Sequence, residues 1–174
     1  GNADMQDFYN TKIAPFAGDE MAKSDLYGRL AGVANEQLKA FMYYKISQAL
    51  ERGVQVDLDV VLSHLKTGME FVDLVRILGI LLDNAIEECM EIPGGHMGIK
   101  ISQNHEMLSI VVKNDVRQDT KEKGVRPGVS TKGEGRGKGL LTVRRIAQQY
   151  DFVALNSYFT GDTFVQSLMV YTEE

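Results

Sequence analysis

The stretch from Leu74 to Met90 constrains the fold of this chain more than any other part of its sequence. Its apolar residues recur with the i, i+3, i+4, i+7 spacing of a helix that buries one face. Asp83 and Asn84 lie in the middle, on or beside the edge of this apolar stripe. Because asparagine is a poor helix former, Asn84 is either a boundary residue bonded to a neighbour or a functional residue. The stripe consists of Leu74, Ile77, Leu78, Leu81, Leu82, Ala85, Ile86 and Cys89.

A second stretch, from Gly128 to Leu141, is rich in glycine and basic residues. Glycine lets the backbone approach a ligand closely, and N–H groups at the start of a helix form a cradle for anions. Lys132 and Arg136 can neutralise phosphate charge, and two hydroxyl side chains precede them. The spacing is not that of a Walker A motif. The stretch therefore predicts a phosphate-binding loop that leads into a helix, with a mobile surface loop as the alternative.

These two stretches resemble motifs of the GHKL superfamily of ATP-binding domains. LLDNAIEEC resembles its N box, and STKGEGRGKGLL resembles its second glycine box. Within the superfamily, this glycine box is similar to that of the sensor histidine kinases of the accessory gene regulator type, which read peptide pheromones in quorum sensing. FYNTKIAP and KISQALERGV resemble the segments that precede the catalytic domain of those kinases. The resemblance extends over nearly the whole chain and implies the catalytic ATP-binding domain of a sensor histidine kinase.

The order of elements predicts a two-layer α/β sandwich, with helices on one face of a mixed, mainly antiparallel sheet of about five strands. The first long helix is either continuous or broken near its two glycines, and Ser24-Asp25 can cap it. Residues 114–126 are predicted to be a loop, and Asp115 to Gly135 to act as a lid. The predicted helices are 4–14, 24–52, 74–90 and 140–150, and the predicted strands are 54–60, 98–102, 107–112, 153–156 and 164–170.

Composition and residue spacing argue against several classes of function. The net charge of −5 gives no general reason to expect nucleic-acid binding. The single cysteine, Cys89, lies on the apolar stripe and is expected to be a buried structural thiol. His64, His96 and His105 show no metal-ligand spacing. No apolar run approaches the roughly 20 residues of a membrane span.

By resemblance, Asn84 is the metal-coordinating asparagine of the N box. A neutral amide oxygen suits Mg²⁺ that already carries phosphates. Ile80 stands where ATP-hydrolysing members carry a general-base glutamate, and because isoleucine cannot accept a proton, little ATPase activity is expected. Glu87 and Glu88 are expected to lie on a solvated helix face.

The adenine contact is assigned by resemblance to Asn114, which corresponds to the asparagine that replaces the usual aspartate in quorum-sensing kinases. Asp115 is the alternative acceptor. Lys138 departs from the aliphatic residue usual at its position and is either a phosphate contact or exposed. The predicted ATP-binding residues are Asn84, Asn114, Ser130, Thr131, Lys132, Gly135, Arg136, Gly137, Gly139 and Leu140.

The resemblance also implies a wider setting. Residues 1–52 would form the end of the dimerisation and linker helices, and 53–174 the catalytic domain. The implied ligands are ATP and Mg²⁺, and the implied partners are the dimerisation and phosphoacceptor domain of the same receptor, as a homodimer, and a response regulator. The phosphoacceptor histidine is expected upstream of Gly1, and this part is expected to be a cytoplasmic domain of a membrane-bound receptor, itself without membrane or nucleic-acid contact. The alternative function is a GHKL nucleotide-binding regulatory module without kinase activity.

Overall fold

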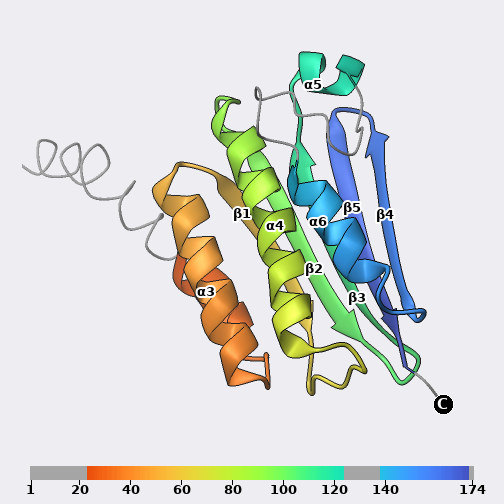
Figure 1. Ribbon diagram of the computed structural model, residues 1–174. Helices are drawn as coiled ribbons and strands as arrows, with labels where there is room; N and C mark the ends of the chain where they lie inside the picture. Colours follow the sequence, from red (N-terminus) through yellow and green to blue (C-terminus); the bar gives the residue numbers. More distant parts are fainter. Residues whose placement is uncertain (1–22, 124–137, 173–174) are drawn as a thin grey trace, which may run out of the picture.

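The computed structural model describes residues 23–123 and 138–172, which form the predicted two-layer α/β sandwich. Within these ranges, a helical segment at 23–30 is followed by three helices that cover one face of a five-stranded sheet, and a shorter helix lies beyond the end of the sheet (Figure 1). The helix predicted at 4–14 lies outside the described residues. The covering helices are α3 (Glu36–Glu51), α4 (Phe71–Met90) and α6 (Lys138–Ala147), and the short one is α5 (Gln118–Lys123).

The sheet is mixed and mainly antiparallel, as predicted. Its strand order is β1-β2-β3-β5-β4, in which β1 runs parallel to β2 and every other neighbouring pair is antiparallel. The second to fifth strands extend past their predicted ends. Hydrogen bonds to a neighbouring strand continue through polar residues, where the sequence no longer alternates between apolar and polar. The turn between β4 and β5 lies at Gly161, whose φ of 58° favours glycine. The strands are β1 (Gln55–Val61), β2 (His96–Gln103), β3 (Met107–Asp115), β4 (Val153–Thr160) and β5 (Thr163–Tyr171).

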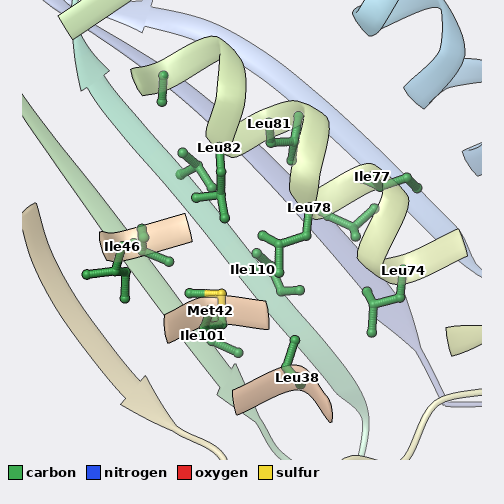
Figure 2. Close-up of a cluster of buried hydrophobic side chains, with 14 of the residues drawn as sticks. Leu38, Met42, Ile46, Leu74, Ile77, Leu78, Leu81, Leu82, Ile101 and Ile110 are labelled. Carbon is green, nitrogen blue, oxygen red and sulfur yellow. The ribbon is translucent and has the colours of Figure 1, made fainter. Parts of the chain in front are cut away.

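Helix α4 lies at the centre of the core. It begins three residues earlier than predicted, and every predicted position of its apolar stripe is buried. Figure 2 shows its leucines in one cluster with Ile110 of β3 and with side chains of α3. Complete burial of one such side chain contributes about 1.5–3 kcal/mol. The helix is therefore held in place along most of its length, and it carries Asn84 as part of a rigid body.

The first long helix is broken, which was one of the two predicted forms. Residues 23–30 are helical, the chain turns at a glycine, and α3 follows. Asn35 caps α3 by accepting a hydrogen bond from the N–H of Leu38 at 2.8 Å. The prediction that Ser24-Asp25 caps the helix is wrong, because Lys23 is already helical.

Helix α3 shares the core of the sheet. Its residues Leu38, Met42 and Ile46 are almost completely buried and lie beside α4 (Figure 2). The part of the chain from α3 onward thus packs around one core. The proposed division into 1–52 and 53–174 stays a prediction.

Candidate functional site

Asn84 lies on α4 at the edge of the buried stripe, half-buried and close to the start of α6. A methyl group added at Gly139 would lie 3.0 Å from Cγ2 of Ile80 and 3.8 Å from Oδ1 of Asn84. The lack of a side chain at Gly139 therefore lets α6 begin against the Asn84 amide. The first N–H groups of a helix have no partner within the helix and favour anions. The structure thus brings the amide that is predicted to bind a metal ion close to the start of a helix, a position that favours anions.

The predicted phosphate-binding loop is only partly within the described residues. Gly139 and Leu140 lie in the first turn of α6, which begins two residues before the predicted helix and ends three residues before its predicted end. The other predicted residues of the loop, namely Ser130, Thr131, Lys132, Gly135, Arg136 and Gly137, lie outside the described ranges.

Asn114 lies near the end of β3, on the face of the sheet that the helices cover, and is 3% exposed. Its Nδ2 donates to the carbonyl oxygen of Asp115 at 2.8 Å, and its Oδ1 bonds to no other residue in the described part of the chain. The Asp115 carboxylate already accepts a hydrogen bond from the N–H of His96 at 3.0 Å. Asn114 stays the predicted adenine contact and Asp115 the alternative, because this bond engages only one of the two Asp115 carboxylate oxygens. Figure 1 shows the end of β3, the C-terminal half of α4 and the start of α6 at the same end of the molecule.

The segment that follows β3 corrects two predictions. Residues 114–126 were expected to be a loop, but β3 continues to Asp115 and the short helix α5 follows. Glu88 was expected on a solvated face, but its side chain is only 6% exposed. The neighbouring Glu87 is exposed, as predicted. Only 115–123 of the predicted lid is described, and the rest of it, to Gly135, lies outside.

Glu88 anchors this segment through four hydrogen bonds. Its Oε1 accepts from the backbone N–H and Nε of Arg117, at 3.1 and 3.2 Å, and from Oγ1 of Thr120 at 2.7 Å. Its Oε2 accepts from Nη2 of Arg117 at 3.3 Å. Burial opposes ionisation of Glu88, but the hydrogen bonds from Arg117 and Thr120 outweigh it and hold the pKa of this carboxyl below its usual value. The carboxylate is therefore a charged, fully engaged anchor at neutral pH.

The burial of Glu88 could have been predicted from its position in the helix. Position 88 is seven residues after Leu81 and three after Ala85, so it belongs to the buried stripe. A glutamate at a stripe position needs partners, because an unpaired buried charge is costly. Those partners, Arg117 and Thr120, are far away in the sequence.

A second charged contact lies beside Asn84. Nζ of Lys45 on α3 donates to Oδ1 of Asp83 at 2.6 Å, and the Lys45 side chain is only 13% exposed. This pair fixes α3 against the part of α4 that carries Asn84. The sequence identified neither partner as paired.

Other features of the structure limit the chemistry of the site. Cys89 is buried, as predicted, and its thiol donates to the carbonyl of His96 at 3.2 Å. Within 23–123 and 138–172, no three His, Cys, Asp or Glu side chains gather as a possible metal site. Over the same ranges, no helix is long and apolar enough to cross a membrane.

A family model described as "GHKL domain" matches residues 69–171 of the chain. This range begins just before α4 and ends with β5, so it includes Asn84, Asn114 and Gly139. The match agrees with the resemblance of the N box and the glycine box.

Curated relatives with significant similarity are sensor proteins of enteric bacteria. Sensor histidine kinase DcuS of Escherichia coli K12 is 30% identical over 124 residues, which are 68% of this chain and 23% of that protein. Sensor protein PhoQ of the same strain is 34% identical over 107 residues, which are 58% of this chain and 21% of that protein. The chain thus spans less than a quarter of the length of these relatives.

Solved structures share the fold. The catalytic domain of histidine kinase ThkA superposes with a TM-score of 0.63 at 19% identity, over 79% of this chain and 91% of that one. Histidine kinase AdeS of Acinetobacter baumannii superposes with a TM-score of 0.57 at 14% identity, over 99% of this chain and 93% of that one. The fold is that of histidine kinase catalytic domains.

Proposed function

Because the chain belongs to the GHKL domain family, we propose that it binds ATP with Mg²⁺ between α4 and the start of α6 and serves as the catalytic domain of a sensor histidine kinase. The close approach of Gly139 to the Asn84 amide carries this proposal. It supplies a neutral oxygen ligand and a helix N-terminus at one place, which suits a metal ion bound to phosphates.

Each part of the nucleotide has a candidate partner. The Oδ1 of Asn84 is proposed to bind Mg²⁺, and the Oδ1 of Asn114 to accept from the 6-amino group of adenine. Backbone N–H groups at the start of α6 are proposed to bind the phosphates, together with side chains of the preceding glycine box. The proposed loop residues are Ser130, Thr131, Lys132, Gly135, Arg136 and Gly137, with Gly139 and Leu140 at the start of the helix.

The proposed reaction is transfer of the ATP γ-phosphoryl group to a histidine nitrogen, with release of ADP. In this reaction the nucleophile is a side chain of a separate dimerisation and phosphoacceptor domain, so the catalytic domain has to hold and aim ATP rather than activate water. Ile80 supports this assignment, because it lies beside Gly139 and has no proton-accepting group. We propose that hydrolysis of ATP by this chain alone is slow.

The STKGEGRGKGL segment supports a finer assignment to the accessory gene regulator type of quorum-sensing receptor. We propose that the full protein is a membrane-bound homodimer whose cytoplasmic part contains this domain and passes the phosphoryl group to a response regulator. The membrane setting rests on the resemblance of this segment to that of membrane-bound peptide-receptor kinases.

The test is phosphoryl transfer in a defined mixture. The chain is mixed with [γ-³²P]ATP, Mg²⁺ and a separately expressed dimerisation and phosphoacceptor domain of the same receptor. We expect acid-labile, base-stable label on the acceptor domain, and no label when the acceptor histidine is replaced by glutamine.

A second function, nucleotide binding without phosphoryl transfer, is favoured by one observation. The adenine contact is the neutral Asn114, which makes a weaker hydrogen bond than a carboxylate. If ATP binds at the site but the acceptor domain stays unlabelled, the regulatory function is correct and the kinase assignment is wrong.

A further inference from the structure

Residues 114–117 are held by hydrogen bonds at each successive position. The Nδ2 of Asn114 donates to the Asp115 carbonyl, and the N–H of the same peptide group, on Val116, donates to the carbonyl of Asp162 at 3.1 Å. The N–H of the next peptide, on Arg117, donates to Glu88 at 3.1 Å. The peptide that orients the Asn114 amide is thus held by β5 and Asp162, and Glu88 holds the next peptide from α4.

Glu88 is the side chain that holds this run from the helix layer. It binds the backbone N–H and guanidinium of Arg117 and the hydroxyl of Thr120, from a position that is almost fully buried. If the carboxylate were lost, these donors would lose their acceptor in a place with little access to water. The backbone at Arg117 would then relax, and the Asp115 carbonyl, one peptide earlier, would lose its support from α4 and keep only that from β5 and Asp162.

The orientation of that amide has a chemical consequence. An asparagine amide presents an acceptor on one side and a donor on the other. Because Nδ2 is engaged by the Asp115 carbonyl, Oδ1 is the atom left to meet a ligand. Oδ1 attracts the 6-amino group of an adenine base and repels the 6-oxo group of a hypoxanthine base. A 6-oxo purine would bind only if the Asn114 amide flipped, so that Nδ2 instead of Oδ1 faced the base.

We propose that Glu88 is a positioning residue for purine selectivity: by fixing Arg117, next to the peptide of Asp115 and Val116, it helps to keep the Asn114 amide in the orientation that accepts a 6-amino purine and rejects a 6-oxo purine. This inference rests on the proposed nucleotide site. It also gives α4 two roles, because Asn84 and Glu88 lie one turn apart on the same rigid helix.

The test compares Mg-ATP with Mg-ITP, which differ at the 6 position of the purine ring. Dissociation constants are measured by calorimetry for the unmodified chain and for Glu88→Gln. The unmodified chain should prefer ATP by about 3- to 10-fold or more, the range expected for one net hydrogen bond. In Glu88→Gln this preference should fall at least about twofold, because loss of the charge weakens the bonds to Arg117 and Thr120 and gives the Asn114 amide more freedom to flip.

Three further variants separate positioning from general stability. Glu87→Gln makes the same chemical change at the exposed neighbouring position and should leave the preference unchanged. Thr120→Val and Arg117→Met remove only part of the anchor, so they should lower the preference by less than Glu88→Gln does. They also take its place if Glu88→Gln does not fold.

The outcomes are distinct. An unchanged ATP preference in folded Glu88→Gln, or in both partial variants, overturns the positioning role even if the melting temperature falls. Equal affinity of the unmodified chain for ATP and ITP overturns the selectivity but leaves nucleotide binding standing. If the unmodified chain binds neither nucleotide, the proposed function itself fails, and the inference fails with it.

Discussion

Replacing Asn84 by alanine is expected to abolish Mg²⁺-dependent ATP binding while leaving the fold intact. The amide lies at the edge of the buried stripe of α4, against the start of α6, so its loss removes the proposed metal ligand without opening a core cavity. We expect the dissociation constant for Mg-ATP to rise at least about 30-fold, equivalent to about 2 kcal/mol. Calorimetry with Mg²⁺ and with excess EDTA measures the metal-dependent part.

The matched control for this variant is Gln48→Ala, which removes an amide from α3, where it bonds to Tyr44. Its affinity for Mg-ATP should equal that of the unmodified chain. Both variants should keep a free energy of unfolding within about 0.5 kcal/mol of the original. A loss of stability in Asn84→Ala comparable to that of a core truncation would show that Asn84 is structural rather than a ligand.

Replacing Leu82 by alanine is expected to lower the free energy of unfolding by about 2–5 kcal/mol, the range of large-to-small substitutions in well-packed cores. The Leu82 side chain is completely buried in the cluster shown in Figure 2. Because α4 packs against both α3 and the sheet, the surrounding side chains have little freedom to fill the cavity. Equilibrium unfolding in urea, monitored by circular dichroism, gives the value.

Val72→Ala is the control on the same helix, because Val72 is 70% exposed. It should change the free energy of unfolding by less than about 0.5 kcal/mol. If Leu82→Ala also costs less than about 1 kcal/mol, the helix is not the centre of the core.

The central helix was predictable because its signal is local. An uninterrupted apolar stripe from Leu74 to Cys89 fixes both the type of element and its buried face, and the structure agrees at every position of that stripe. The five strands followed from alternation and from turn residues such as Gly161. Their ends were less predictable, because ladder pairing with a neighbour extends a strand through polar residues.

Long-range contacts explain what sequence patterns missed. Helix α5, with the sequence QDTKEK, has no apolar periodicity, and its start is held by Glu88, a residue 29 positions before Arg117. Glu88 was expected on a solvated face together with Glu87, although its position belongs to the buried stripe. Only the folded chain shows that its partners come from beyond β3.

In the candidate site too, the sequence identified single residues, and the structure identified the contacts between them. Motif resemblance pointed separately to Asn84 and to Gly139, and the structure shows that the second lies against the first. The resemblance also pointed to Asn114, and the structure adds the hydrogen bond that orients its amide. The choice of Asn114 over Asp115 stays a prediction from the resemblance, while the hydrogen bonds that these two side chains make are visible only in the folded chain.

Titration of the folded, unmodified chain with ATP by calorimetry, with and without Mg²⁺, is the most direct test of a nucleotide site at Asn84. We predict binding that requires Mg²⁺, with a dissociation constant on the order of 10–1000 μM, because a neutral adenine contact limits the affinity. No detectable hydrolysis of ATP should accompany it. Absence of binding at millimolar ATP and Mg²⁺, in a sample that unfolds cooperatively, would contradict the assignment of this site.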